Sequence, residues 1–174
     1  MVVKSFTSGH ALIIGVGADL PVTVSDATAL HDVLIDPKRA AYSIDQVELL
    51  TEAKANREDV MLAFDRLVKR TAKTTDATVI VYYSGHGGRI VRGGKPADYF
   101  LVPYGYDPGD RPGTAISGAE FTSKIEAIRA ERLIVILDCC HAGGVPSVKD
   151  PGERFVKSPV PPDLLDVLHS GSGG

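Results

Sequence analysis

Two apolar runs that each end in chemically reactive side chains constrain the fold of this chain most. Residues 133–137 read Leu-Ile-Val-Ile-Leu and precede Asp-Cys-Cys-His, and residues 79–83 read Val-Ile-Val-Tyr-Tyr and precede Ser-Gly-His-Gly-Gly. Runs this rich in β-branched residues predict strands buried on both faces, as in a parallel sheet. Open α/β sheets place functional groups just past the carboxyl ends of such strands. We therefore expect polar turns after both runs that bring His86 and a cysteine together.

The only two cysteines of the chain, Cys139 and Cys140, are adjacent. A thiolate attacks a carbonyl carbon, and a nearby imidazole can take the thiol proton and later protonate the leaving amine. Strand alternation puts Asp138 and Cys140 on one side of the ribbon and Cys139 on the other. We therefore predict that Cys140 is the nucleophile, that His86 is the general base, and that Cys139 packs in the core.

Residues 83–88, Tyr-Ser-Gly-His-Gly-Gly, and residues 138–143, Asp-Cys-Cys-His-Ala-Gly, resemble the paired motif of the metacaspases and bacterial caspase-like cysteine peptidases. The separation of 54 positions between His86 and Cys140 is similar to the caspase spacing of about 50. The resemblance implies a cysteine endopeptidase with a three-layer α/β fold, in which a mostly parallel sheet has helices on both faces. It covers nearly the whole chain but only the large-subunit part of the family.

The resemblance also implies roles for the residues around the dyad. The backbone N–H groups of Gly87 and Cys140 would form the oxyanion hole. Asp26 and Asp138, together with Ser84, would bind an Arg or Lys side chain of the substrate, because a guanidinium pairs well with two carboxylates. From position alone, Asp26 could simply favour the first turn of a helix through the helix dipole, and Asp138 could be a structural carboxylate held by backbone N–H groups.

Helical periodicity and capping residues predict three helices, at residues 25–36, 56–73 and 117–130. Their expected starts are Ser25, Asn56 and a capping box of Ser117 and Glu120. The inner face of the first helix is expected to carry Ala29, Leu30, Val33 and Leu34. Further strands are predicted at residues 10–17, 46–51 and 98–103. The first of them ends in Gly-Val-Gly-Ala-Asp, but the third glycine and immediate helix of a dinucleotide-binding loop are missing, so nucleotide binding is not favoured.

We expect a catalytic domain over residues 1–144 and an exposed loop, short helix and flexible tail over residues 145–174. If the enzyme prefers basic residues, Lys149, Arg154 and Lys157 are candidates for self-processing downstream of the cysteine. The small-subunit strands that the caspase fold places beside the cysteine-bearing strand are not recognised in this chain. The apolar strand at 133–137 would then be an exposed edge, so we expect a second chain or a small-subunit-like segment to cover it.

Composition limits the classes of binding partner and the cellular compartment that we expect. The formal net charge of −3 offers no basic field for nucleic acid or an anionic membrane. Adjacent cysteines cannot staple distant segments, and no signal peptide is recognised, so we expect a cytoplasmic protein that acts on peptides or proteins.

No cofactor is predicted, and calcium stays open as an alternative. Metacaspases often carry an acidic calcium site before the helix expected at 117, but its paired carboxylates are absent and only Asp98, Asp107 and Asp110 remain. The adjacent Cys-Cys-His at 139–141 is poor spacing for zinc. The rival hypothesis is a catalytically silent caspase-fold interaction module, which the presence of both His86 and Cys140 disfavours.

Overall fold

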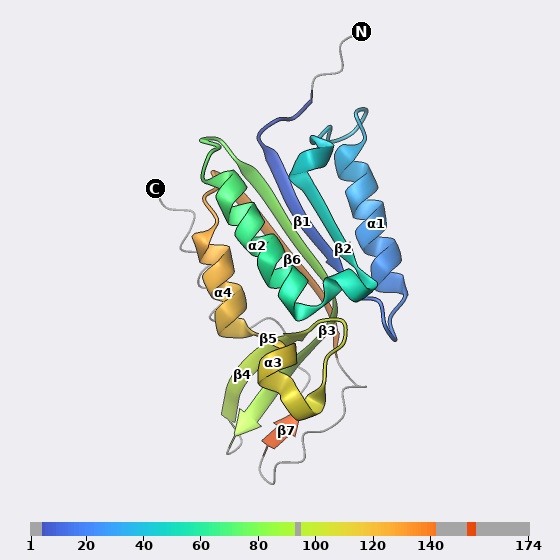
Figure 1. Ribbon diagram of the computed structural model, residues 1–174, viewed down its shortest axis with the longest axis vertical. Coiled ribbons are helices and arrows are strands. Elements are labelled where there is room, and N and C mark those ends of the chain that lie inside the picture. Colours follow the sequence, from blue (N-terminus) through green and yellow to red (C-terminus); the bar gives the residue numbers. More distant parts are fainter. Residues whose placement is uncertain (1–4, 93–94, 142–152, 156–174) are drawn as a thin grey trace.

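A mixed seven-stranded sheet organises the chain (Figure 1). The computed structural model describes residues 5–92, 95–141 and 153–155. The parallel part of the sheet has the spatial order β2-β1-β3-β6. These strands are β1 (Gly9–Gly15), β2 (Val47–Thr51), β3 (Thr78–Arg92) and β6 (Arg132–His141).

The second half of β3 leaves the parallel part and enters an antiparallel one, at the bottom of Figure 1. There β3 pairs with β4 (Lys95–Val102) and with β7 (Glu153–Phe155), and β4 pairs with β5 (Ile116–Ser117). Helix α3 (Arg111–Thr114) lies in the connection between β4 and β5. Short 3-10 helices span Ile44–Gln46, Glu52–Ala55 and Pro108–Asp110.

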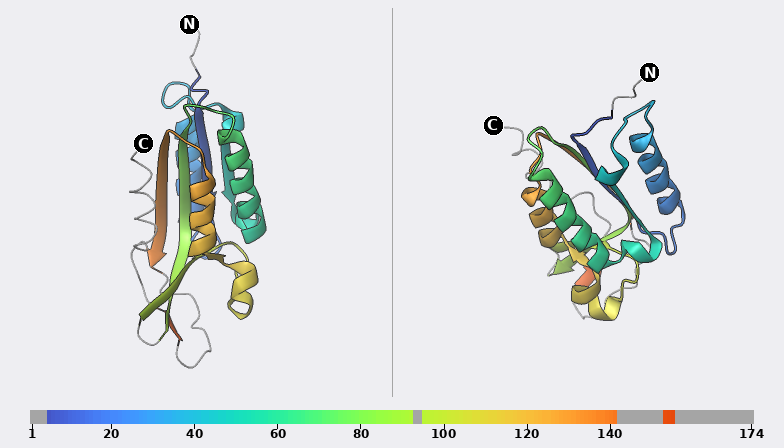
Figure 2. Two further views of the ribbon diagram at one scale, coloured as in Figure 1. Left: turned by 90° about the vertical axis from the view of Figure 1, so that its left-hand side faces the viewer. Right: turned by 45° about the horizontal axis from the view of Figure 1, so that its top comes forward.

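Helices cover both faces of the sheet, as the right-hand view of Figure 2 shows. On one face, α1 (Val22–Ile35) packs over the side chains of Ala11 and Ile13. On the other face, α2 (Arg57–Thr71) and α4 (Gly118–Ala127) pack over Leu12 and Ile14. Alternate residues of β1 thus enter two separate cores, so all seven residues of this strand are buried. The predicted α/β fold with a helical layer on each face is confirmed.

The predicted start of the first helix is wrong. Helix α1 begins at Val22, and its N-cap, Pro21, makes no side-chain hydrogen bond. The buried face carries Thr23, Ala27 and Leu34. The reason lies in the preceding turn: the Thr23 hydroxyl accepts a hydrogen bond from the N–H of Gly17, six residues earlier, at 2.8 Å, and this contact fixes where the helix begins.

The cap residues of the other two long helices are confirmed. The Asn56 side chain accepts a hydrogen bond from the N–H of Asp59 at 2.9 Å at the start of α2. Ser117 and Glu120 form the predicted capping box at the start of α4. Local sequence is sufficient here because each cap involves groups only three residues apart.

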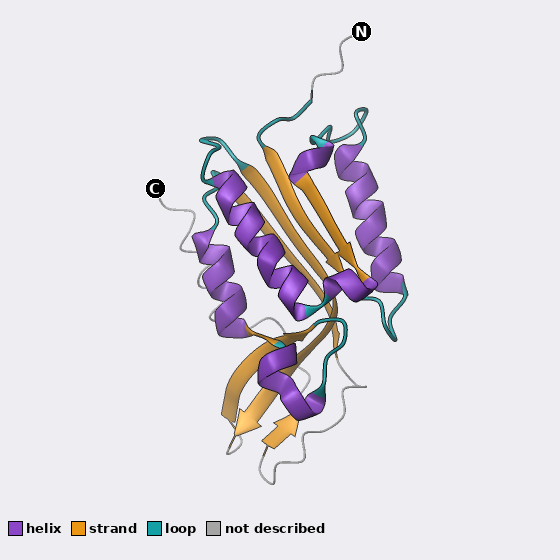
Figure 3. Ribbon diagram, viewed as in Figure 1, coloured by secondary structure: helices purple, strands orange, loops and turns teal. Residues whose placement is uncertain are grey.

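The predicted ends of the two central strands are also wrong. Both β3 and β6 continue through the polar residues, so His86 and Cys140 lie inside strands and not in turns. Figure 3 shows the strands as orange ribbons, seen as in Figure 1. The parallel pairing of β3 and β6 extends to the pair Gly87 and His141. Beyond it, β4 supplies an antiparallel partner that keeps β3 extended to Arg92.

The cysteine-bearing strand lies at the edge of the described sheet. Within residues 5–92, 95–141 and 153–155, β6 pairs with β3 alone, and Ile134 and Ile136 are 48% and 41% exposed. Arg154, predicted in an exposed loop, lies in β7 opposite Val91, because β3 extends far enough to offer it a pairing edge. Lys149, Lys157, the predicted short helix and the tail lie outside the described residues.

No helix in the described part of the chain is both long enough and apolar enough to cross a membrane.

Candidate active site

Parallel pairing brings the two predicted dyad positions next to each other. In the register of β3 and β6, His86 pairs with Cys140 and Ser84 pairs with Asp138. Neighbouring strands lie about 4.8 Å apart, and residues that pair in register occupy the same face of a sheet. Of Cys140 the structure describes the backbone position. His86, Cys140, Ser84 and Asp138 therefore share one face, and Tyr82, two residues earlier on β3, shares it as well.

The imidazole of His86 is held by a carboxylate that sequence analysis did not select. Nε2 of His86 lies 2.9 Å from Oδ2 and 3.1 Å from Oδ1 of Asp19. A carboxylate only accepts hydrogen bonds, so Nε2 carries the proton in this pair. The other ring nitrogen, Nδ1, is buried and has no hydrogen-bond partner within the described residues. The hydrogen bond from His86 lowers the pKa of Asp19.

A buried tyrosine supports the backbone at His86 from the opposite face. The Tyr83 hydroxyl donates to the carbonyl of Val102 at 2.8 Å and lies 3.1 Å from the carbonyl of His86. Burial raises the pKa of Tyr83, and neighbouring Cys139 acts in the same direction, so the hydroxyl remains a donor. Cys139 packs against the core beside this tyrosine, as predicted. The Tyr83 hydroxyl therefore links the backbone at His86 to β4, from the face opposite the imidazole.

Two glycines beside His86 are required by close packing. A Cβ at Gly85 would lie 2.6 Å from Cγ2 of Val16, and a Cβ at Gly87 would lie 2.8 Å from the hydroxyl of Tyr99. Real Cβ atoms essentially never approach other atoms this closely. The Ser-Gly-His-Gly sequence thus lets β3 pass between the end of β1 and β4 while keeping His86 at the face that Cys140 shares.

An acidic cluster lies next to the dyad positions. Oδ2 of Asp138 accepts hydrogen bonds from the Ser84 hydroxyl at 3.1 Å and the Tyr82 hydroxyl at 3.4 Å. Burial raises the pKa of Tyr82, and the negative charges of Asp138 and Asp26 add to that effect. Both carboxylates are exposed, whereas Ser84 is 1% exposed. The structure thus brings Ser84 and Asp138 into contact and sets Asp26, on α1, close enough to act on the same tyrosine.

Two residues of this region, Asp19 and Tyr82, were not predicted from the sequence. Asp19 follows the carboxyl end of β1, the position at which open α/β sheets keep functional groups, so its place in the chain was a usable signal. Tyr82 alternates with Ser84 and His86 along β3, and strand periodicity could have placed it on their face.

The acidic residues considered for calcium have local structural roles. The Asp107 side chain accepts a hydrogen bond from the N–H of Gly109 at 2.8 Å, and the Asp110 side chain caps α3. In the described part of the chain, no three His, Cys, Asp or Glu side chains are grouped so that they could hold a metal ion.

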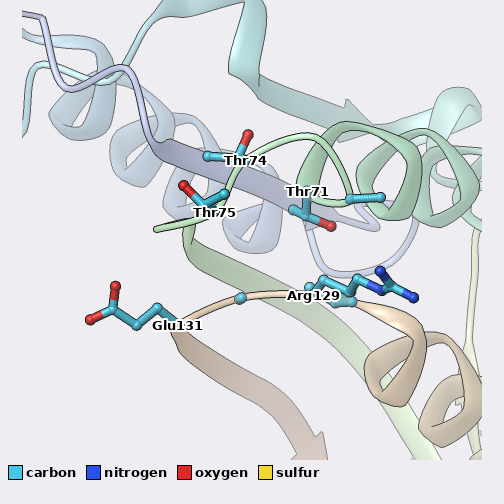
Figure 4. A pocket seen from close by; sticks show the side chains of 8 residues that line it. Thr71, Thr74, Thr75, Arg129 and Glu131 are labelled. Atoms are coloured by element: carbon cyan, nitrogen blue, oxygen red, sulfur yellow. The ribbon is translucent and has the colours of Figure 1, made fainter.

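A hollow of about 510 Å³ lies at the opposite end of the sheet, near the carboxyl ends of α2 and α4 (Figure 4). Among its lining residues, the hydroxyls of Thr71 and Thr74 already donate to the backbone carbonyls of Val68 and Arg70. Arg129 and Glu131 extend in different directions from its rim in Figure 4. This hollow is therefore separate from the site at His86.

The family comparison agrees with this geometry. A model of the caspase domain matches residues 8–169, a range that contains His86, Cys140 and every strand described above. No curated protein matches the chain. Since the matched range covers most of the chain and the fold has the expected α/β layers, the chain belongs to the caspase-domain family of cysteine peptidases.

Proposed function

We propose that this protein is a cysteine endopeptidase in which Cys140 is the nucleophile and His86 the general base. The observation that carries the proposal is the register of β3 and β6, which pairs His86 with Cys140. The tautomer of His86 supports it, because Nε2 is occupied by Asp19 while buried Nδ1 has no partner within the described residues. A nitrogen in that state has a lone pair available for a thiol proton.

The reaction follows from these two groups. Nδ1 of His86 takes the proton of the Cys140 thiol, and the thiolate sulfur forms a bond to the scissile carbonyl carbon. The tetrahedral intermediate collapses when the C–N bond breaks and His86 returns the proton to the leaving amine. Water, deprotonated by His86, then hydrolyses the acyl-enzyme and restores the thiol. No redox partner is needed.

Backbone N–H groups of Gly87 and Cys140 are proposed as the oxyanion hole. The two positions are one register step apart on adjacent strands, since Gly87 follows His86 and His86 pairs with Cys140. On the opposite face, a Cβ on Gly87 would lie 2.8 Å from the Tyr99 hydroxyl, so the backbone at Gly87 packs closely against β4. Donors fixed in this way need no reorganisation when negative charge develops on the carbonyl oxygen.

We further propose that the enzyme cleaves after Arg or Lys. Within the described residues, the hydroxyls of Ser84 and Tyr82 both contact Oδ2 of Asp138, and Oδ1 is proposed to bind the side chain of the substrate. Asp26 adds a second carboxylate near Tyr82. A guanidinium between two carboxylates gains charge-assisted hydrogen bonds, each stronger than a neutral one.

The exposed edge of β6 is the proposed docking site of a small-subunit-like segment or a second chain. Ile134 and Ile136 remain 48% and 41% exposed on a strand that has an unpaired edge within the described sheet. Soluble proteins avoid such edges because they invite further strand pairing. If cleavage follows basic residues, Lys149, Arg154 and Lys157 remain the candidates for self-processing.

The test is cleavage of matched fluorogenic peptides that end in Arg, Lys or Asp. Wild type is compared with Cys140→Ala and with Cys139→Ser, a matched control that keeps an acceptor for the Tyr99 hydroxyl. Cleavage after Arg or Lys that is lost only in Cys140→Ala is the expected result. Cleavage after Asp would retain the peptidase and overturn the pocket assignment. No cleavage, with Cys140 inert to a thiol-reactive peptide probe, would favour the silent interaction module.

The pocket is tested separately with Asp138→Asn and a pair of peptides ending in Arg or in its neutral isostere citrulline. Loss of one charge-assisted contact, about 1.5–3 kcal/mol, should lower the preference for Arg about 10- to 100-fold. An unchanged Arg-to-citrulline ratio would show that Asp138 is a structural carboxylate.

A further inference from the structure

The contact between Asp19 and His86 stands out because it joins the β1–α1 turn to the general base proposed above. Nε2 of His86 reaches both carboxylate oxygens of Asp19, at 2.9 and 3.1 Å. The imidazole is 16% exposed, whereas the Asp19 side chain is 66% exposed. No other hydrogen bond to this ring is present within the described residues, so Asp19 alone fixes its rotation there.

The conformation of the turn that carries Asp19 is fixed by hydrogen bonds. Gly17 and Ala18 both adopt positive φ, at 71° and 57°, and the N–H of Leu20 closes the turn on the carbonyl of Gly17 at 3.0 Å. The buried Thr23 hydroxyl accepts from the N–H of Gly17 and donates to the carbonyl of Leu20, both at 2.8 Å. A left-handed backbone is unfavourable for alanine, and such strain persists only where its surroundings impose it.

The turn is also tied directly to the strand that carries His86. The N–H of Val16 donates to the carbonyl of Ser84 at 3.0 Å, and β1 pairs with β3 up to Gly15 and Ser84. The side chain of Val16 occupies the space that a Cβ at Gly85 would need. Asp19 is therefore held next to His86 by contacts that neither residue makes itself.

We infer that Asp19 is a positioning residue for His86, which keeps the proton of the neutral imidazole on Nε2 and directs Nδ1 toward the position of Cys140. The inference rests on the proposed roles of His86 and Cys140. When Nδ1 accepts the thiol proton, the ring becomes an imidazolium with both nitrogens protonated, and the Asp19 carboxylate balances its positive charge. When Nδ1 gives that proton to the leaving amine, the starting tautomer is restored.

The alternative is that Asp19 and His86 form an ordinary surface ion pair with no role in catalysis. Exposed pairs of this kind contribute little to folding, and their removal leaves function elsewhere unchanged. The chain contains a matched example on α1, where Asp32 is 68% exposed and contacts Nδ1 of His31 at 3.0 Å. Asp32→Asn therefore removes the same charge from the same kind of pair, away from the residues of the candidate site.

The first measurement is the alkylation rate of Cys140 by iodoacetamide as a function of pH, from which the rate of Cys140→Ala is subtracted. A thiolate stabilised by an imidazolium reacts well below the ordinary thiol pKa of about 8.5. In Asp19→Asn this low-pH reactivity should fall about tenfold, because general-base effects amount to roughly 10²–10⁴-fold and the charge is one part of them. Asp19→Ala should lose more than Asp19→Asn, since the amide oxygen of Asn still accepts from Nε2.

The second measurement is peptide cleavage by the same variants. Asp19→Asn should lower kcat by about 10- to 100-fold with little change in KM, because the chemical step is affected and the pocket is intact. Asp32→Asn should match wild type in both measurements.

The outcomes distinguish the role of Asp19 from the proposed peptidase function. If wild type is active and Asp19→Asn behaves as Asp32→Asn does, the positioning role is overturned and the proposed function stands. If Cys140 of wild type reacts no faster than an ordinary thiol and no peptide is cleaved, the proposed function fails and the role of Asp19 fails with it. A large rise in KM with unchanged kcat would place Asp19 in substrate binding instead, which also overturns the inference.

Discussion

Removing a buried hydroxyl group should lower the stability of the protein at Tyr83 but not at Tyr106. The Tyr83 hydroxyl is fully buried and donates to the carbonyl of Val102 at 2.8 Å, beside the carbonyl of His86. The Tyr106 hydroxyl is also buried but has no partner within the described residues, while its ring stacks on Phe100 at 6.1 Å. The substitutions Tyr83→Phe and Tyr106→Phe therefore remove the same atom from a satisfied and an unsatisfied position.

The magnitudes follow from the cost of unmade hydrogen bonds. Tyr83→Phe leaves a buried carbonyl without its donor, which costs about 1–3 kcal/mol. For a chain of 174 residues, about 2 kcal/mol corresponds to a fall of about 4–8 °C in Tm. Tyr106→Phe removes a polar atom that is desolvated without compensation, so stability should stay the same or rise by about 1 kcal/mol.

Urea unfolding followed by far-UV circular dichroism measures both changes, and an unchanged m-value shows that the folded surface is the same. Tyr104→Phe is the control, because Tyr104 is 38% exposed and its change should stay within about 0.5 kcal/mol. Equal losses for Tyr83→Phe and Tyr106→Phe, or a larger loss for Tyr106→Phe, would show that the hydrogen bond of Tyr83 does not set the difference.

Two further predictions concern stability. Burial, aided by the charge of Arg70, lowers the pKa of His10, so below about pH 6.5 the unfolded chain binds a proton that the folded chain does not. The free energy of unfolding should therefore fall as the pH is lowered from 7 to 5. His10→Gln should reduce this dependence on pH, and an unchanged dependence in His10→Gln would contradict the prediction. Ser117→Ala should cost about 1 kcal/mol in urea unfolding because it breaks the capping box of α4, whereas Ser117→Thr should cost clearly less, and equal losses would argue against the cap.

Local sequence patterns predicted the starts of helices correctly where the groups that form the cap are close in sequence. Asn56 and the pair Ser117 and Glu120 cap their helices as predicted, because each cap is made by groups three residues apart. The opposite sides of Asp138 and Cys139 followed from strand alternation alone, and Cys139 packs against the core while Asp138 is exposed.

The predicted boundaries were wrong where contacts outside the helix or strand decide them. Ser25 is a good cap by composition, but α1 begins at Val22 because Thr23 is bound into the turn that follows β1. The glycines around His86 indicated a turn, yet β3 continues because β4 and β6 both pair with it. Backbone groups that find partners on neighbouring strands stay extended even where the local sequence favours a turn.

The sequence alone predicted two apolar strands that lead to His86 and Cys140, and it placed Asp138 on the same face as Cys140. The folded chain adds Asp19 and Tyr82 to the site, because each contacts a site residue that lies 67 or 56 positions away in the sequence. A sequence motif identifies the side chains that the reaction needs. The orientation of those groups depends on strand register and on turns packed from elsewhere, and no local pattern encodes such long-range contacts.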